Sequence, residues 1–324
     1  MEAMLDQQQS KNKHFDDPST LPKTLYREHI EACGKPENAF TFDFMCDYLT
    51  MMDTLAKSMT RTLEEVCSLT LLQYRILIRL LDRSYRTSEL ADILHVRTST
   101  ISTAIAKLAS RRLIARQEDP SDMRVVDLEI SRAGRTMIAR ADEALESVIS
   151  TYWNSLSQEQ LRAAMESSIS AVERHSIPRF DGGTLRVDTA LLETVAISRS
   201  LTAHCLEHEG LTTNDYRIML ALKVMGSSCC GADIAKFLFL NSCDITSSLK
   251  NLEALRYITR KRDQHNRRMR PITLTPLGET RTSELLPPVF DALHETCHSN
   301  DELIRIHISS ARDLVARKRH RSEF

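Results

Sequence analysis

The sequence contains few glycine, proline and aromatic residues. Its 324 residues include 8 Gly and 9 Pro, and aromatic side chains make up 5% of the chain. Sandwiches and barrels need many turns rich in Gly and Pro, so this composition favours helices. The formal net charge is −1. Overall basicity therefore does not indicate a nucleic-acid partner, and such a partner would have to bind local basic clusters.

The sequence also lacks an apolar run of membrane-spanning length, and its N-terminus lacks the apolar core of a signal peptide. Eight cysteines are scattered without a CxxC pair, which is typical of free thiols in a reducing cytosol. We therefore expect a cytoplasmic protein. The motifs GxGxxG, P-loop, HExxH and GxSxG are missing as well, so we expect neither an enzyme nor a cofactor.

The sequence does contain an internal repeat. Tyr-Arg-Ile occurs at Tyr74–Ile76 and at Tyr216–Ile218, and the segments that follow align without a gap at an offset of about 144 residues. Solenoid repeats are much shorter, so this period indicates two duplicated domains. We predict a poorly ordered extension at 1–38, a first domain at 39–176, a linker at 177–184 and a second domain at 185–324.

Both copies show the same order of predicted elements. A long amphipathic helix comes first, then three short helices, a β-hairpin and closing helices. In the first copy these are Phe40–Val66, Thr70–Leu81, Arg86–Leu94, Thr98–Arg111, the strands Leu113–Gln117 and Arg124–Ile130, and then Arg132–Ser150 and Gln158–His175. In the second they are Leu185–Glu209, Thr212–Lys223, Gly231–Phe239, Ser242–Leu255, the strands Tyr257–Arg262 and Met269–Leu274, and then Pro276–His298 and Asp301–Arg319.

The second and third short helices of each copy form a helix-turn-helix pattern, in which the last helix fits the major groove of DNA. Thr98 or Ser99, and Asn241 or Ser242, are suitable N-cap residues for that last helix. Polar side chains alternate there with apolar ones at helical spacing, and the second hairpin is strongly basic. The DNA-binding candidates are Arg97, Thr98, Ser99, Thr100, Ser102, Thr103, Lys107, Arg111, Asn241, Ser242, Thr246, Ser247, Lys250, Asn251, Lys261, Arg262, Arg267 and Arg270.

The segments around the first helix-turn-helix and its hairpin resemble the MarR family of winged-helix regulators. The hairpin sequence DPSDMRVVDLEISRAG looks like that family's D-x-R pattern, with Asp122 and Arg124 at its two positions. The resemblance implies that Arg124 enters the minor groove and that Asp122 helps to hold it. Asn266 and Arg268 occupy the same positions in the second copy, and Asp244 stands where the first recognition helix has Thr100. These departures imply that the halves are not equivalent on DNA.

Members of that family are usually homodimers. The resemblance therefore implies a mainly α fold with small β-hairpin wings, in which two winged helix-turn-helix domains form a pseudo-twofold, dimer-like monomer. Double-stranded DNA is the expected partner, through a pseudo-palindromic or asymmetric operator. The alternative is an antirepressor-like interaction protein that kept the fold without specific DNA binding.

Three sensor hypotheses remain open. A small amphipathic ligand could be lined by Phe44, Met45, Tyr48, Met51, Met52 and Met59, although such a stripe is more often ordinary core. Cys229, Cys230 and Cys243 are redox candidates, although an inert thiol is the commoner case. The i, i+4 pairs His204/His208 and His294/His298 are weak zinc candidates, and helical His pairs more often lie in solvent or at an interface.

Overall fold

The computed structural model describes residues 42–94, 96–119, 122–154, 156–174, 187–226, 229–260 and 271–297, together with residue 315. The chain forms two compact units. The α6 unit, named after helix α6 (Thr98–Ser110), comprises Met51–Ser200 and Thr296–Phe324. The α12 unit, named after helix α12 (Ser242–Ala254), comprises Met1–Thr50 and Leu201–Glu295. None of the helices in these described ranges is long and apolar enough to cross a membrane.

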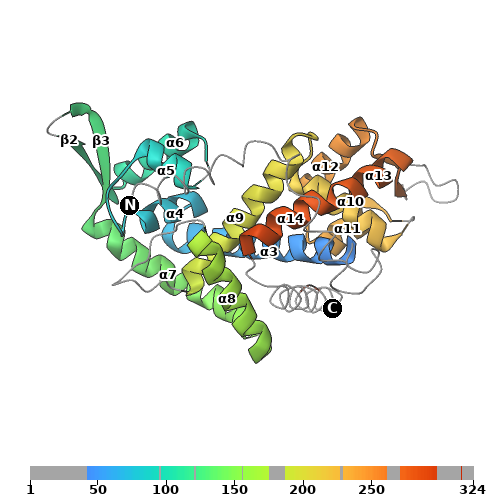
Figure 1. Cartoon of the computed structure of the whole chain (residues 1–324), viewed down its shortest axis with the longest axis horizontal. Coiled ribbons are helices and arrows are strands. Elements are labelled where there is room, and N and C mark those ends of the chain that lie inside the picture. The colour runs from blue at the N-terminus through green and yellow to red at the C-terminus, as the bar shows by residue number, and fades with distance from the viewer. Residues whose placement is uncertain are drawn as a thin grey trace, which may run out of the picture. The chain divides into compact units, whose positions relative to one another are not determined.

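The α6 unit consists mainly of helices around a small antiparallel sheet (Figure 1). Its three-stranded sheet has the order β1-β3-β2. The strands β2 and β3 pair over six registered positions and extend beyond α5 and α6 as a two-stranded ribbon (Figure 1). The elements after α3 are α4 (Leu71–Arg79), β1 (Tyr85–Arg86), α5 (Thr87–Leu94), α6 (Thr98–Ser110), β2 (Ile114–Asp119), β3 (Asp122–Ile130), α7 (Arg132–Trp153) and α8 (Gln158–Arg174).

The α12 unit repeats this order with a shorter sheet. Its strands β4 and β5 pair antiparallel over three positions, and an isolated bridge joins Cys229 to Ile272 where the α6 unit has β1. The elements are α10 (Thr213–Met225), α11 (Gly231–Leu238), α12 (Ser242–Ala254), β4 (Ile258–Arg260), β5 (Ile272–Leu274), α13 (Pro276–Glu284) and α14 (Leu286–Cys297).

Two long helices have residues in both units. The helix α3 (Phe42–Cys67) begins in the α12 unit and ends in the α6 unit, whereas α9 (Val187–Glu207) begins in the α6 unit and ends in the α12 unit. Each unit therefore contains part of a long helix whose sequence belongs to the repeat that forms most of the other unit. The predicted boundaries of the sequence repeat, at residues 39–176 and 185–324, remain a prediction.

Buried apolar residues fix the orientation of the two predicted recognition helices. Ile101, Ile105 and Leu108 of α6 are buried, as their helical spacing predicts. Ile245, Leu249 and Leu252 of α12 are buried at the equivalent positions. Each helix therefore turns one face into its unit and leaves the opposite, polar face to solvent.

Matching hydrogen bonds hold the end of each sheet to the helix that follows. The Ser131 hydroxyl donates to the carbonyl oxygen of Arg112 at 2.8 Å and accepts the Gly134 N–H at 3.0 Å. The Thr275 hydroxyl makes the same two bonds, at 2.7 Å to Arg256 and at 3.0 Å from Gly278. A Cβ atom at either glycine would fall on a backbone carbonyl oxygen, of Leu113 or of Tyr257. Both glycines are thus required by close packing of the helix on the turn.

Buried polar contacts tie the first short helix of each unit to a long helix. In the α6 unit, Arg75 and Arg79 of α4 both bind the carboxylate of Glu193 on α9, with N–O distances of 2.9–3.1 Å. In the α12 unit, Arg217 of α10 donates to the Thr50 hydroxyl on α3 at 3.4 Å and to the Leu238 carbonyl at 2.7 Å. In both cases the two partners belong to different repeats of the sequence: Glu193 to the second and Thr50 to the first.

The structure corrects the predicted elements in three places. The helix expected at Pro276–His298 is two helices with a break at Leu285, because Pro287 and Pro288 supply no N–H groups to continue the first one. The two-residue strand β1 was not predicted, since so short a strand leaves no periodic pattern. The N-cap of α6 is Arg97 rather than Thr98 or Ser99. The predicted extension at 1–38, linker at 177–184 and helix at Asp301–Arg319 lie outside the described residues, apart from residue 315.

Candidate nucleic-acid interface

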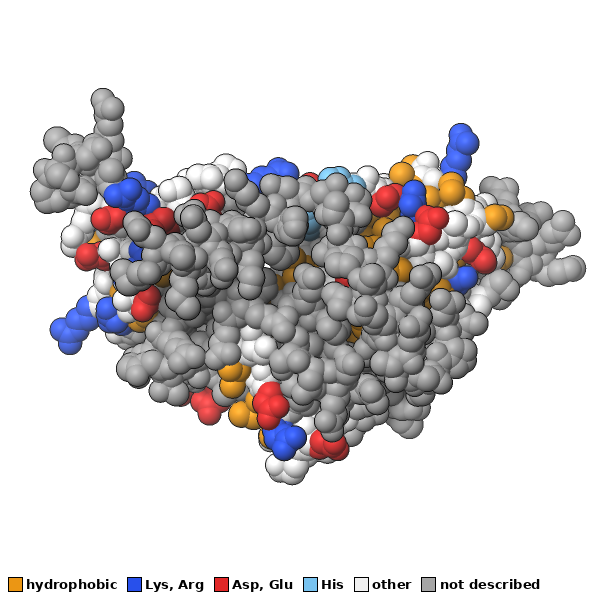
Figure 2. Space-filling model, viewed as in Figure 1, with side chains coloured by type: hydrophobic (Ala, Val, Ile, Leu, Met, Phe, Trp, Pro, Cys, Tyr) orange, Lys and Arg blue, Asp and Glu red, His pale blue; other side chains and the backbone are white. Residues whose placement is uncertain are grey.

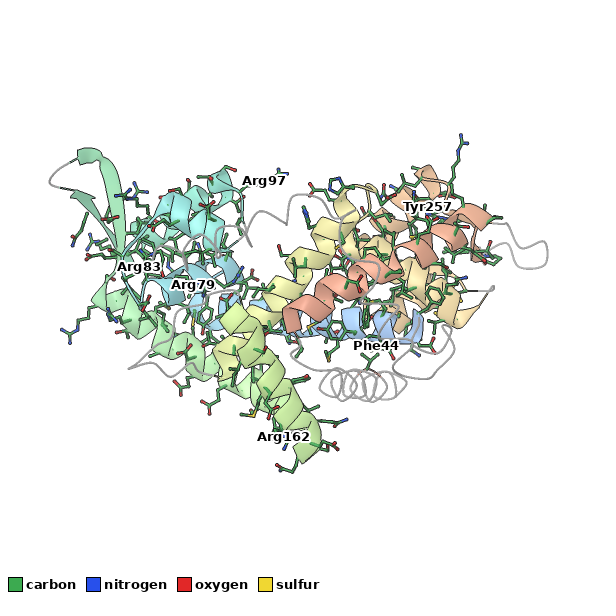
Figure 3. All side chains as sticks on the ribbon, viewed as in Figure 1. Phe44, Arg79, Arg83, Arg97, Arg162 and Tyr257 are labelled. Atoms are coloured by element: carbon green, nitrogen blue, oxygen red, sulfur yellow. The ribbon has the colours of Figure 1, made fainter. Side chains whose placement is uncertain are left out.

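The outer face of α6 is a continuous polar surface. Five of the predicted hydroxyl side chains and one lysine are exposed on this face, opposite the residues that pack into the core. These exposed residues are Thr98, Ser99, Thr100, Ser102, Thr103 and Lys107. Arg97 is exposed at the start of the helix, and its side chain reaches beyond the ribbon of α6 (Figure 3). The structure thus brings these seven predicted residues together on one surface.

The hydroxyls on this surface divide into two groups. Ser102 donates to the Thr98 carbonyl at 2.9 Å, and Thr103 donates to the Ser99 carbonyl at 3.0 Å. With their protons used inside the helix, these two hydroxyls present lone pairs outward, which can accept from the amino groups of adenine or cytosine. Within the described part of the chain, no hydrogen bond uses the hydroxyls of Thr98, Ser99 and Thr100. These three can donate to phosphate oxygens.

The N-terminus of α6 is suited to an anion. Its N-cap residue, Arg97, makes no side-chain capping bond, and the first turn has no acidic residue. The first N–H groups of a helix need acceptors from outside it, and the helix dipole places partial positive charge there. A phosphate oxygen at this end would meet both requirements, with Arg97 and the hydroxyls of Thr98 and Ser99 beside it.

The N-terminus of α12 differs although its exposed face is similar. Asn241, Ser242, Thr246, Ser247 and Lys250 are all exposed, as predicted. Asn241 is the N-cap, and its side-chain oxygen accepts the backbone N–H of Asp244 at 2.7 Å. The acidic Asp244 lies in the first turn. An internal cap and a carboxylate together make this helix end a poorer site for phosphate.

Two predicted DNA-binding side chains make hydrogen bonds within the fold, and their role on DNA stays a prediction. Arg111 donates to the carbonyl oxygens of Ser68 and Cys67, at 2.6 Å and 2.8 Å, and so closes the C-terminal end of α3. Asn251 donates to the Gly210 carbonyl at 3.0 Å and to the Asp215 carboxylate at 2.9 Å, at the start of α10. Their spacing along the recognition helices predicts that Arg111 and Asn251 face outward. Both instead donate to carbonyl oxygens at or just after the C-terminal end of an earlier helix, which have no partner within that helix.

The wing residues are only partly described. Asp122 and Arg124 lie in β3, whose backbone pairs with β2, and their side chains are outside the described residues. The second-wing candidates lie outside them entirely: Lys261, Arg262, Asn266, Arg267, Arg268 and Arg270.

The helix-turn-helix of the α6 unit is ordered by a cluster that the sequence analysis missed. The guanidinium of Arg83 stacks on the Tyr85 ring at 3.8 Å and forms an ion pair with Glu89 at 3.3 Å. The Glu89 carboxylate accepts the Arg86 backbone N–H at 2.8 Å, and this bond, helped by Arg83, lowers the pKa of Glu89. The cluster fixes the chain where β1 enters α5. Glu89, three residues after the start of the predicted helix at Arg86, is the only sequence signal of this cluster.

The sensor candidates divide by burial. Phe44, Met45, Tyr48, Met51, Met52 and Met59 are all buried. Cys229 is buried, Cys230 is half-buried and Cys243 is exposed on α12. His204 lies on α9 and His208 directly follows its last residue, Glu207, with the two ring centroids 6.0 Å apart. Among the side chains that the structure describes, no three His, Cys, Asp or Glu form a metal-binding group. The side chain of His294 and all of His298 are outside that part.

Comparison with known proteins gives a family match for part of the chain. Residues 69–126 match the MarR family, a segment that includes α4, α5, α6 and β2. The structure is similar to the transcriptional regulator BldR from Sulfolobus solfataricus, with 26% identity and a TM-score of 0.30 over 32% of this chain and 74% of that one. It is also similar to YusO protein from Bacillus subtilis, with 19% identity and a TM-score of 0.35 over 44% of this chain and 100% of that one.

A third similar structure is a mutant of S. aureus MepR bound to an oligodeoxyribonucleotide. It has 20% identity and a TM-score of 0.30, over 37% of this chain and 91% of that one. No curated protein matches the chain.

Proposed function

We propose that this protein is a transcriptional regulator that binds double-stranded DNA through two recognition helices, α6 and α12, and the hairpin wing that follows each. The observation that carries the proposal is the exposed face of α6. It combines hydroxyl side chains, Lys107 and an uncapped helix N-terminus, and it lies within the segment that matches the MarR family. These are the groups that contact base edges and phosphates in a major groove.

The second half of the chain supports a tandem arrangement. The hydrogen bonds of Ser131 and Thr275, and the close contacts of Gly134 and Gly278, are the same in both units. Each unit also takes part of a long helix from the other similar segment. In a homodimer such exchanged helices would join two chains, so this pattern favours a monomer built as a pseudo-dimer.

The proposed halves are not equivalent. The open N-terminus of α6 favours a phosphate, whereas Asp244 at the N-terminus of α12 repels one and can accept from the amino group of cytosine. The operator is then an asymmetric or imperfectly palindromic site. Fusion of the two halves raises the effective concentration of the weaker half at its DNA, so a weaker second contact is tolerated.

A mobility-shift assay on duplexes from the region upstream of the protein's own gene tests the proposal. We expect a shift that weakens steeply as salt rises, because binding releases counterions from the phosphates. Thr100→Asp should weaken the shift by about tenfold, since it places a carboxylate in the first turn of α6. Ser283→Asp, which adds the same charge at an exposed position of α13, is the matched control.

Absence of any shift by the wild-type protein would contradict the proposal and favour the antirepressor-like alternative. A shift that Thr100→Asp and Ser283→Asp weaken equally would show that α6 is not the reading helix. Regulation by a ligand at the buried methionines or by oxidation at Cys243 is a separate part of the proposal. It is tested by whether small aromatic acids or peroxide change the same shift.

A further inference from the structure

Four arginines lie together at the base of the first wing, on the side where α6 and α3 end. All four are exposed, and Figure 2 shows Lys and Arg side chains at the N-terminal end of α7, at the left edge of the view. We call this group the arginine patch: Arg112, Arg132, Arg135 and Arg140. None was among the residues that the sequence analysis selected.

Backbone contacts bring these arginines together from two segments. The Ser131 hydroxyl binds the Arg112 carbonyl at 2.8 Å, which places the start of α7 against the turn after α6. Three of the four arginines then lie within the first nine residues of α7, which span about 13 Å at 1.5 Å per residue. Arg140 also lies close enough to Cys67 for its charge to act on that thiol, so the patch extends to the end of α3.

The patch carries an unbalanced positive charge. Within the described residues, none of the four arginines forms an ion pair, although other exposed arginines of the same unit do. The first acidic residue of α7 is Asp142, which is buried and accepts from the Tyr74 hydroxyl at 2.6 Å. In a chain with a net charge of −1, four such arginines are a local concentration of charge with no ion-pair partner among the described residues.

Two of these arginines are unfavourable for the helix that carries them. Arg132 and Arg135 lie in the first turn of α7, where the helix dipole opposes positive charge. The equivalent helix α13 has Pro276 and Glu279 at these positions, which are favourable residues there. Helix stability therefore does not account for the arginines of α7.

The second unit shows that the wing base does not need this charge. The four positions 144 residues later hold Arg256, Pro276, Glu279 and Glu284. Both glutamates are paired there, Glu279 with Lys223 at 3.7 Å and Glu284 with Arg281 at 2.9 Å. The same scaffold thus carries a neutralised surface in one unit and a strongly basic one in the other.

The chemistry of the patch selects its partner. Among the described residues only Val66 and Leu277 are large hydrophobic side chains with an exposed surface, and neither is an aromatic anchor of the kind that protein interfaces use. Clustered arginines without an apolar anchor beside them are typical of phosphate contacts. The patch also continues along the chain from α6 into β2, which are the elements proposed to contact DNA.

We infer that the arginine patch binds the phosphate backbone of DNA that flanks the site read by α6. The protein would then contact a longer stretch of flanking DNA beyond the α6 site than beyond the α12 site. This inference rests on the proposed function. Flanking DNA would bend towards the wing base, and its deformation would be offset by phosphate contacts, as in other proteins that bend DNA. The binding site is then longer on one side than the two recognition helices require.

Salt-dependent binding of two duplexes tests the inference. The probes are fluorescent duplexes from the upstream region: about 20 base pairs, which covers two half-sites one helical turn apart, and about 40 base pairs, which adds flanking DNA. The double variant Arg132→Gln/Arg135→Gln removes two charges from the patch. The double variant Arg61→Gln/Arg162→Gln removes two charges from exposed arginines elsewhere in the same unit.

The slope of log affinity against log salt is negative, and on the long duplex it should be less steep for the patch variant by about 1.8, at about 0.9 per lost phosphate contact. Between about 50 and 200 mM salt the wild-type affinity should then fall roughly tenfold more than that of the variant. On the short duplex the two proteins should have the same slope. The Arg61/Arg162 control should match the wild type on both, and the thermal stability of the patch variant should be unchanged or higher.

Several results would overturn the inference. One is an equal slope for the wild type and the patch variant on the long duplex, with normal binding by both. Another is an equal change in the salt slope of the Arg61→Gln/Arg162→Gln control on the long duplex. A third is loss of binding to a polyglutamate peptide with no change on DNA, which would assign the patch to an acidic protein. If the wild type binds neither duplex, the proposed function fails, and that result is distinct from all three.

Discussion

The helices α6 and α12 show how one scaffold can carry two different surfaces. Both bury three apolar residues at equivalent positions, and both follow a short helix in the same order. Their N-cap residues are also equivalent, since Arg97 and Asn241 are 144 residues apart. Arg97 leaves its helix end uncapped, whereas Asn241 closes its own. The shared core therefore sets the position of each helix, while a few exposed residues set what it can bind.

The same division holds for the helices that follow the wings. Ser131 and Thr275 begin α7 and α13 with matching bonds, yet the first turn of α7 is basic and that of α13 begins with proline and contains Glu279. In both pairs the α12 unit has the residues that stabilise a helix N-terminus, whereas α6 has no side-chain cap and α7 carries arginines in its first turn. We infer that the α6 unit exchanges some local stability for contact with DNA.

The largest expected effect concerns the buried charges of the α6 unit. Glu193→Ala should destabilise the protein by about 3–5 kcal/mol, because it leaves Arg75 and Arg79 buried without their carboxylate. The equivalent contact of the α12 unit is weaker, so Thr50→Ala should cost about 1 kcal/mol. Chemical denaturation of both variants measures the difference, and Glu166→Ala, in an exposed pair with Arg162, is the control.

The Glu193 contact should also depend on pH. Burial raises the pKa of this carboxyl group, but the charges and hydrogen bonds of Arg75 and Arg79 outweigh burial and lower it. Its contribution to stability is therefore full above the unfolded pKa, about 4.3, and is lost as pH falls through the lower folded value. Thermal melts between about pH 6 and pH 3 should show a steeper loss for the wild type than for Glu193→Gln. Parallel curves would contradict this.

The two close glycines should respond alike. Gly134→Ala and Gly278→Ala each direct a methyl group at a backbone carbonyl, so each should cost about 3 kcal/mol, at the upper end for overpacking. Gly226→Ala, where a Cβ atom meets nothing within 4 Å but φ is +78°, separates the effect of packing from that of backbone conformation. If one of the two packed glycines tolerated alanine, the wing bases would not be equivalent.

These comparisons also show what the sequence could predict. The recognition helices were predicted within one residue because Ile101, Ile105 and Leu108, like their counterparts in α12, repeat at helical spacing. The paired strands also follow from the sequence, since β-branched runs flank polar turns. Residues that pack inward obey a local periodicity, and a single sequence is sufficient to show it.

The roles of exposed residues were harder to predict. Arg111 and Asn251 have the spacing of outward-facing side chains, but each binds a carbonyl group about 40 residues earlier in the chain. Arg132 and Arg135 were missed for the opposite reason, since a sequence shows charge but not which charges lack a partner. The exchange of α3 and α9 between units depends on contacts more than 100 residues apart, which no local pattern contains.

Exchange of one residue should shift the balance between the two reading helices. Thr100→Asp gives α6 the carboxylate of α12, and Asp244→Thr gives α12 the hydroxyl of α6. We expect the first change to weaken DNA binding by about 1–2 kcal/mol and the second to strengthen it by about 0.5–1 kcal/mol, since the acid opposes phosphate at a helix N-terminus. Fluorescence anisotropy on the upstream duplex measures both. Weaker binding by Asp244→Thr would mean that Asp244 accepts from a base.

The smallest expected effects separate stability from binding at the two N-caps. Asn241→Ala should lower the free energy of unfolding by about 1 kcal/mol, because the Asp244 N–H loses its acceptor. Arg97→Ala should lower the free energy of unfolding by less, because its side chain makes no capping bond to lose. On DNA the order should reverse, with Arg97→Ala the more damaging, since Arg97 faces the end of the helix that has no internal acceptor. If denaturation and anisotropy ranked the two variants in the same order, the cap would not distinguish α6 from α12, and the asymmetry would have to come from the wings.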